Sequence, residues 1–177
     1  MRGLKGKIAV VALSLMAGMA SAKEALLEVH LSQILSQAKA EAAFIKVDIT
    51  NHGDTALLLP RPFTPLEQMD GHLLNNIFAV KGTDGASARF VGRSIRMLPE
   101  AKQQFYTRID PGQTLSNEVS LSADYALSSG YYEISYEQGY TGLAGYQSDD
   151  EPLETEKSNT LRIHANENLI LGEHLKR

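Results

Sequence analysis

The chain of 177 residues contains no cysteine. This absence excludes disulfide bonds, a lipid anchor on an N-terminal cysteine and a cysteine nucleophile. The folded protein must therefore be held together by its hydrophobic core.

Long apolar runs are absent apart from one near the start. Arg2, Lys5 and Lys7 precede an apolar segment at residues 8–20, and small residues at 20–22 follow it, which is the pattern of a secretory signal peptide. About 13 apolar residues are too few for the roughly 20 that cross a bilayer as a helix. We therefore predict an exported protein, periplasmic or secreted, without a membrane span.

Basic residues are in deficit once this signal peptide, residues 1–22, is removed. The chain has 17 Lys and Arg against 21 Asp and Glu, and residues 23–177 keep 14 of the basic residues and all of the acidic ones, a formal net charge of −7. A nucleic-acid binder needs the opposite balance, because phosphate neutralisation supplies much of its affinity. We expect no nucleic-acid partner, one folded domain at residues 23–165 and a C-terminal tail at residues 166–177.

The sequence also lacks the motifs that mark common catalytic sites. It has no Gly-x-Ser-x-Gly elbow, no phosphate-binding glycine loop and no dinucleotide fingerprint. We therefore expect a protein that is not an enzyme and that holds no metal or cofactor. A metal site assembled across strands stays open as an alternative. The five histidines lie far apart in the sequence, at His30, His52, His72, His164 and His174.

Alternating apolar residues predict β-strands along most of the chain. Ile45, Val47 and Ile49 alternate with polar residues, the pattern of a half-buried strand. Only residues 32–43 and the tail from Glu167 are candidate helices. Short strands separated by turn signals predict an all-β fold, an antiparallel immunoglobulin-like β-sandwich of seven to nine strands. The remaining strands are predicted at residues 29–31, 56–59, 76–80, 88–91, 105–109, 115–121, 132–136 and 160–164.

One tyrosine fits a known feature of such sandwiches. In domains of immunoglobulin type, a tyrosine near the start of a late strand returns its hydroxyl to the backbone of the preceding corner. Tyr132 follows the corner at residues 124–131 directly. We predict this structural role for Tyr132, with a ligand-binding role as the alternative.

Two neighbouring segments have the composition of surface loops. Residues 136–146 alternate tyrosine with glycine, a composition favoured in recognition loops, and Tyr140 and Tyr146 are candidates for contact with a partner. The alternative is that these tyrosines fold back on the sandwich. Residues 148–156 hold five acidic side chains, which predict either a solvated loop or an acidic patch for a basic partner.

The stretch RPFTPLEQMDG, residues 61–71, joins two predicted strands with more apolar residues than a turn requires. As structure, Phe63 and Leu66 would cover one end of the sandwich while Pro62 and Pro65 keep the chain out of the sheet. As function, the same residues would form a proline-stiffened binding loop in which Glu67 approaches a metal or a basic subsite of the partner. Phe63, Pro65, Leu66 and Glu67 are therefore candidate partner-binding residues.

A series of motifs extends this interpretation over residues 44–136. The most specific are Thr64-Pro65-Leu66-Glu67 and the block LSADYALSSGYYEISY, residues 121–136. In their order and spacing they resemble the N-terminal propeptide domain of aspzincins, secreted zinc endopeptidases that include deuterolysin and the peptidyl-Lys metalloendopeptidases. The supporting motifs are Asn51-x-Gly53-Asp54, Ile77-Phe78-x-Val80, Asp84-Gly85, Gly92-Arg93, Arg96, Pro99 and Pro111-Gly112.

The chain departs from that family at one decisive point. An aspzincin propeptide is followed by a catalytic domain with a His-Glu-x-x-His motif and a ligand Asp, and neither is present here. The resemblance therefore implies a free-standing relative of the propeptide, with no catalytic residue. Such a propeptide is expected to cover the active site of its peptidase and to assist its folding.

From residues and resemblance together we expect a non-catalytic binding protein, an inhibitor or folding chaperone of a secreted zinc metallopeptidase. A different class stays open: an envelope or adhesion-type β-sandwich that binds other surface proteins through an exposed sheet edge. The oligomeric state does not follow from the sequence.

Overall fold

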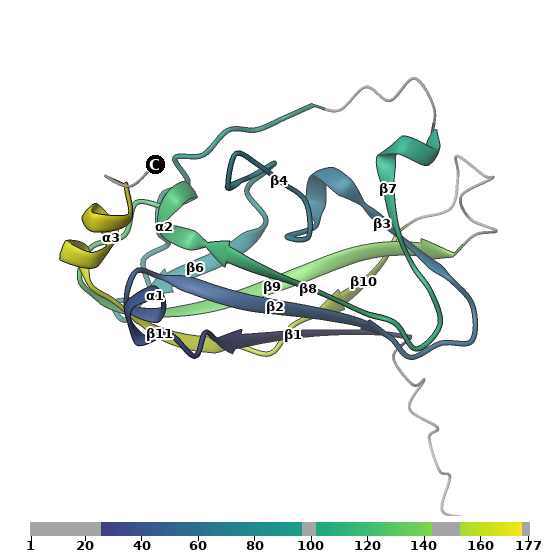
Figure 1. The fold of residues 1–177 in the computed structure, drawn as a ribbon, viewed down its shortest axis with the longest axis horizontal. Helices are drawn as coiled ribbons and strands as arrows, with labels where there is room; N and C mark the ends of the chain where they lie inside the picture. The colour runs from purple at the N-terminus through teal and green to yellow at the C-terminus, as the bar shows by residue number, and fades with distance from the viewer. Residues whose placement is uncertain (1–25, 97–101, 143–152, 175–177) are drawn as a thin grey trace, which may run out of the picture.

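The fold was analysed in a computed structural model that describes residues 26–96, 102–142 and 153–174. Two antiparallel sheets pack face to face and enclose the core (Figure 1). The fold is therefore an all-β antiparallel sandwich, as predicted, whereas the immunoglobulin-like topology stays a prediction.

The first sheet has three strands in the order β1-β2-β8. They are β1 (Leu27–Gln33), β2 (Phe44–Asn51) and β8 (Thr114–Ser120). In β2, Ile45, Val47 and Ile49 are fully buried while Lys46 is exposed. The predicted alternation of the strand is confirmed, because side chains on a strand point to opposite faces in turn.

The second sheet is built around β9 (Gly130–Gly142). Along one side of β9 run β10 (Glu154–Lys157) and then β11 (Leu161–Ala165). Along the other side run β6 (Phe78–Gly82) and β3 (Leu57–Pro60), and β3 also pairs with β7 (Tyr106–Ile109).

Two further strands form a small hairpin, β4 (Gln68–Met69) and β5 (His72–Leu73). The two main sheets thus have nine strands, and the hairpin raises the number in the described residues to eleven, above the predicted seven to nine. The hairpin escaped prediction because strands of two residues leave no alternation to read.

The helices are short: α1 (Gln37–Glu41), α2 (Leu121–Asp124) and α3 (Glu167–His174). The predicted helix at residues 32–43 is wrong in its extent, because its first residues continue β1 and pair with β2. In the predicted tail, α3 forms from Glu167 and buries Ile170 against the core. No helix in the described part of the chain is long and apolar enough to cross a bilayer.

Two local predictions are also corrected. Residues 88–91 do not form a strand and make only one isolated bridge, between Phe90 and Tyr125. The acidic run at 148–156 is not all loop: Glu154 begins β10, where it pairs with Tyr140 of β9. The rest of that run, up to residue 152, lies outside the described residues.

The two sheets are joined at one edge by a side chain. The amide of Asn159, between β10 and β11, accepts from the Leu31 N–H at 2.7 Å and donates to the Leu31 carbonyl at 3.0 Å. Leu31 belongs to β1, the edge strand of the first sheet. Asn159 therefore satisfies main-chain groups that an edge strand otherwise leaves open.

Candidate functional site

Residues 61–71 form a compact crossover, here named the braced segment. It starts as a single 3₁₀ turn (Arg61–Phe63), becomes extended at Thr64 and enters the hairpin at Gln68. Asp70 and Gly71 close the hairpin with φ angles of 55° and 76°. Positive φ at both positions is the geometry of a type I′ turn, which Asp-Gly favours.

The main chain of the braced segment is held by side chains from outside it. The Tyr136 hydroxyl of β9 donates to the Phe63 carbonyl at 2.7 Å, and the Asn117 amide of β8 donates to the Pro65 carbonyl at 2.9 Å. The Asn75 amide donates to the Pro62 carbonyl at 3.0 Å. Three main-chain carbonyls of the segment are thus held in place, so the segment is ordered without a partner.

The braced segment also covers an edge of the first sheet. β8 is the last strand of that sheet, and the Gln68 amide donates to the Glu118 carbonyl of β8 at 2.9 Å. Pro62 and Pro65 are both buried. Because proline has no N–H to donate, the segment lies along β8 without becoming a strand of the sheet.

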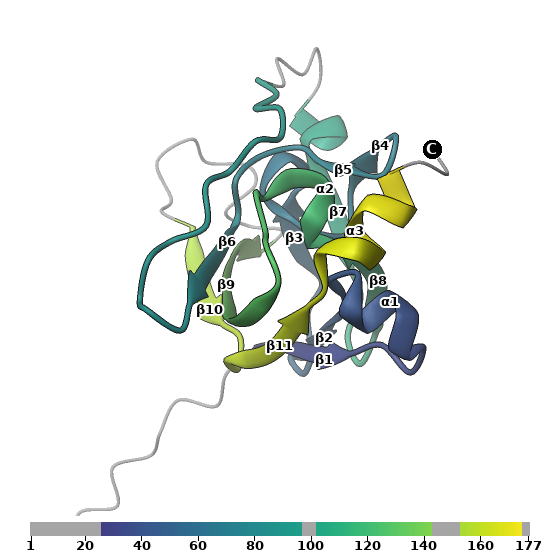
Figure 2. The same cartoon turned by 90° about the vertical axis from the view of Figure 1, so that its left-hand side faces the viewer.

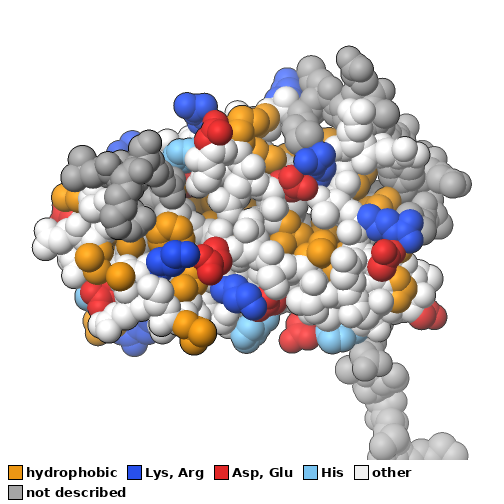
Figure 3. Space-filling view, in the orientation of Figure 1, with side chains coloured by type: hydrophobic (Ala, Val, Ile, Leu, Met, Phe, Trp, Pro, Cys, Tyr) orange, Lys and Arg blue, Asp and Glu red, His pale blue; other side chains and the backbone are white. Residues whose placement is uncertain are grey.

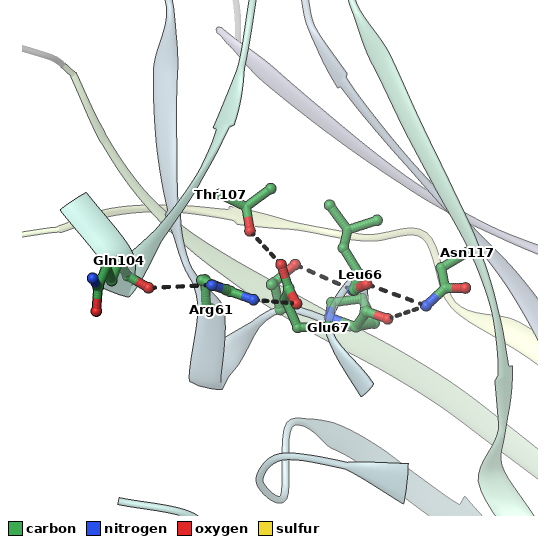
Figure 4. A network of polar contacts seen from close by, with 8 residues as sticks. Arg61, Leu66, Glu67, Gln104, Thr107 and Asn117 are labelled. Atoms are coloured by element: carbon green, nitrogen blue, oxygen red, sulfur yellow. Dashed lines mark hydrogen bonds and ion pairs between the residues drawn. The ribbon is translucent and has the colours of Figure 1, made fainter. Parts of the chain in front are cut away.

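An ion pair joins Arg61, the first residue of the segment, to Glu67. Arg61 Nη2 lies 2.9 Å from Glu67 Oε2, and the hydroxyl of Thr107 on β7 donates to Glu67 Oε1 at 2.9 Å (Figure 4). Arg61 and Thr107 therefore contact different oxygens of the Glu67 carboxylate. The buried Nε of Arg61 has no partner among the described residues.

Beneath the segment lies a polar group inside the core. Tyr136 is 3% exposed, and its hydroxyl also contacts Oε1 of the fully buried Gln138 at 2.5 Å. Burial raises the pKa of Tyr136 well above its ordinary value, while a hydrogen bond with Thr64 opposes this shift. The hydroxyl stays protonated, and its single proton is shared between the Phe63 and Gln138 oxygens.

The predicted residues on this segment differ in their exposure. Phe63 is 49% exposed, whereas Pro65 is buried and Leu66 and Glu67 are half-buried. Leu66 packs against the core, and Glu67 makes the two contacts described above. The structure therefore presents Phe63 to solvent and gives the other three residues contacts within the protein.

Sequence reasoning missed Met69 and the bracing residues. Met69 is 50% exposed beside the hairpin turn, in the same segment as Phe63. Asn117 carried a usable signal, because it is a polar residue between Leu115 and Val119 on an otherwise apolar strand face. Nothing in the local sequence around Tyr136 indicated its hydrogen bond to the Phe63 carbonyl.

The described part of the glycine-tyrosine segment, residues 136–142, belongs to β9. Tyr140 is 5% exposed, and its hydroxyl donates to Glu154 Oε2 at 2.8 Å. Burial, followed by this hydrogen bond, raises the pKa of Tyr140 to about 12. Tyr140 thus corresponds to the alternative in which the tyrosines fold back, and Tyr146 lies outside the described residues.

The predicted structural role of Tyr132 is confirmed, and Tyr125 makes a similar contact at a more deeply buried position. The Tyr132 hydroxyl donates to the Ser128 carbonyl at 3.3 Å, in the corner before β9. Tyr125 is more deeply buried: its hydroxyl accepts from the Phe78 N–H at 3.0 Å and donates to the Asn76 side chain at 2.8 Å. Burial raises the pKa of Tyr125 to about 12.

Histidines and acids of the described residues form pairs rather than larger groups. His72 Nδ1 lies 3.0 Å from the buried Asp124, and His52 lies 2.6 Å from Glu28. No group of three or more potential metal ligands occurs in the part of the chain that the structure describes.

Comparison with known proteins gives similarities to eleven solved chains, two of which are described in this paragraph. No family model matches the chain, and no curated protein does. A Northeast Structural Genomics Consortium target, SoR45, has a TM-score of 0.37 and 11% identity over 78% of this chain and 84% of its own. The putative ApaA protein from Bordetella pertussis has a TM-score of 0.39 and 9% identity over 78% of this chain and 91% of its own.

Proposed function

We propose that this chain is an exported, non-catalytic binding protein of the propeptide type, which inhibits a secreted zinc metallopeptidase of the aspzincin kind or assists its folding. The braced segment is its contact surface. One observation supports the proposal above the others: Phe63 is half exposed on a main chain that Tyr136 and Asn117 hold from two different strands.

The physical basis is preorganisation. Binding costs free energy for each loop that must become ordered, and a loop that is ordered already avoids much of that cost. The hydrogen bonds to Phe63 and Pro65 order the main chain in the free protein. The free energy gained when an apolar side chain enters a pocket of the partner is then retained as affinity.

Two exposed side chains make the contact in this proposal. Phe63 and Met69 are each about half exposed, and both offer apolar area to a pocket on the peptidase. Glu67 acts as a brace, because Arg61 and Thr107 occupy both of its oxygens. The mechanism is steric: the segment fills the substrate cleft and supplies no reactive group.

The test is a titration of aspzincin-type peptidase activity with the mature chain. We expect inhibition, and we expect Phe63→Ala and Met69→Ala each to raise the inhibition constant by about five- to thirtyfold, the effect of losing roughly 1–2 kcal/mol at a central contact. Leu153→Ala is the matched control, since Leu153 is 46% exposed but precedes β10. All variants are first checked for native folding by circular dichroism.

Each outcome has a separate meaning. If inhibition occurs but Phe63→Ala and Met69→Ala leave it unchanged, the contact surface is elsewhere. If a panel of aspzincins is neither inhibited nor helped to refold, the peptidase partner is wrong, whatever the variants do.

The alternative function is an envelope or adhesion-type sandwich that joins partners through a sheet edge. Two edges of the described sheets are already engaged. Asn159 bonds the Leu31 main chain on β1, and Gln68 bonds Glu118 on β8. This occupancy favours a contact through the braced segment. Identification of proteins captured from culture supernatant separates the two functions, since surface proteins in place of a peptidase would support the alternative.

A further inference from the structure

A second exposed surface lies away from the braced segment, where α1, β11 and α3 come together (Figure 2). Leu35, in the turn between β1 and α1, is fully exposed, with 104% of its reference area accessible. Tyr131, at the start of β9, is 51% exposed. Apolar side chains are visible at this end of the molecule in Figure 3.

A groove of about 320 Å³ opens directly beside Leu35. Its lining is half apolar, from Ile34, Leu35, Ala40 and Ile163, and half polar, from Gln33, Gln37, Glu41 and His164. Its polar side chains are engaged with one another or with main chain: the Gln37 amide donates to Glu41 at 2.8 Å, and the Gln33 amide donates to the Arg162 carbonyl at 3.1 Å. The apolar part of the lining can therefore receive an apolar side chain.

The groove has an acidic residue in its lining and a basic residue outside the lining, on the β11 side. On the α1 side lies the carboxylate of Glu41. On the β11 side, the Arg162 guanidinium stacks over the Tyr131 ring at 4.8 Å, and His164 packs against the same ring at 4.8 Å. Tyrosine and arginine are enriched where proteins bind each other.

We propose that this face binds a second copy of the chain across a two-fold axis, with Leu35 of each copy in the groove of the other. In a two-fold interface the same patch occurs on both copies, so the patch must be complementary to itself. A protruding leucine beside a partly apolar groove meets that condition. In the proposed arrangement, Glu41 of one copy also faces Arg162 of the other, so that their opposite charges attract each other.

The dimer is expected to be weak. Stable interfaces bury roughly 1,600 Å² in total, and the patch around Leu35 and Tyr131 is small. We expect a dissociation constant in the micromolar range. The dimer does not depend on the braced segment, so it stands or falls separately from the proposed function.

Sedimentation of the mature chain between about 1 and 200 µM tests the proposal, because these concentrations bracket a micromolar dissociation constant. We expect the mean mass to rise from monomer to dimer. Leu35→Asp should stay monomeric throughout, while the control Leu153→Asp should dimerise like the unchanged chain. A monomeric unchanged chain at the highest concentration, or a dimeric Leu35→Asp, would overturn the proposal.

The absence of cysteine allows a second, geometric test. A Leu35→Cys chain is mixed with an Ala40→Cys chain under mild oxidation, and a disulfide-linked mixed dimer is expected because each Leu35 approaches the Ala40 groove of the other copy. Mixtures with a Leu153→Cys chain should cross-link at least tenfold more slowly. Equal cross-linking in the two mixtures would contradict the proposed pairing.

Discussion

The Tyr136 hydroxyl donates a 2.7 Å hydrogen bond from the core to the main-chain carbonyl of Phe63, a residue whose own side chain is half exposed. The two residues are 73 positions apart in the chain. A buried side chain thus determines where an exposed one is presented.

Tyr136→Phe removes this hydroxyl and little else. Because the Phe63 carbonyl and the Gln138 side chain then lack a donor in a buried place, we expect the free energy of unfolding to fall by about 1–3 kcal/mol. Urea denaturation measures the change. Tyr131→Phe is the control: Tyr131 is half exposed, and its substitution should change stability by less than about 0.5 kcal/mol. Equal effects of the two variants would show that the buried hydroxyl does not hold the segment.

Asn117→Asp keeps the shape of the side chain but replaces its amide donor with oxygen. Asn117 Nδ2 now donates to the carbonyls of Pro65 and Leu66 at 2.9 and 3.4 Å, and a carboxylate would repel both. We expect a loss of about 1–3 kcal/mol in stability and faster hydrogen exchange at the Leu66 amide. Asn168→Asp in the exposed first turn of α3 should be neutral or slightly stabilising. Unchanged exchange at Leu66 would rule out bracing by Asn117.

Gly92→Ala should destabilise the protein through a clash. A Cβ atom at Gly92 would lie 2.5 Å from Asp124 Oδ1 and 2.7 Å from the Phe90 ring. We expect a cost of about 1–3 kcal/mol, as for other overpacked sites, measured by the thermal midpoint. Gly172→Ala in α3 meets nothing within 4 Å, and it should raise stability by about 0.5–1 kcal/mol because alanine favours helix. A neutral Gly92→Ala would mean that Asp124 and Phe90 can both move aside.

Stability should decline at alkaline pH. In the folded protein, burial raises the pKa of Tyr125 from 10.0 to about 12, so the folded state keeps a proton that the unfolded state releases. Below about pH 10 the tyrosine is protonated in both states, and the free energy of unfolding is unaffected by its titration. As the pH rises from about 10 towards about 12, the unfolded state loses the proton and becomes more favourable, so the free energy of unfolding falls. Urea midpoints from neutral pH to about pH 11 measure the decline. Tyr125→Phe should be less stable at neutral pH but show a shallower decline, and an identical slope would contradict the assignment.

The parts of the fold that follow from short-range alternation were predictable. Ile45, Val47 and Ile49 identified both β2 and its buried face, because a strand repeats every two residues. β10 was not identified as a strand, since its charged composition is typical of a loop. It pairs with β9, and the Tyr140 hydroxyl of β9 donates a hydrogen bond to the Glu154 carboxylate of β10.

The location of the candidate site could be predicted from the sequence, but the residues that hold it in place could not. Proline and apolar content drew attention to residues 61–71, and Phe63 is exposed there. The hydrogen bonds that hold the segment are donated by Asn117 and Tyr136, which lie 52 and 73 positions away from their acceptors in the sequence. The local pattern of β8 marks Asn117 as an unusual residue, but it does not identify its acceptor 52 positions away. Only the fold therefore shows that Phe63 is exposed and Pro65 buried.

Small secreted domains are often stabilised by disulfide bonds, whereas amide and hydroxyl donors hold the braced segment in this chain without cysteine. The shape of the braced segment is therefore indifferent to the redox potential of its surroundings. A thiol reductant that collapses a disulfide-bonded loop should leave Phe63 in place, while mild urea, which competes for hydrogen bonds, should release it.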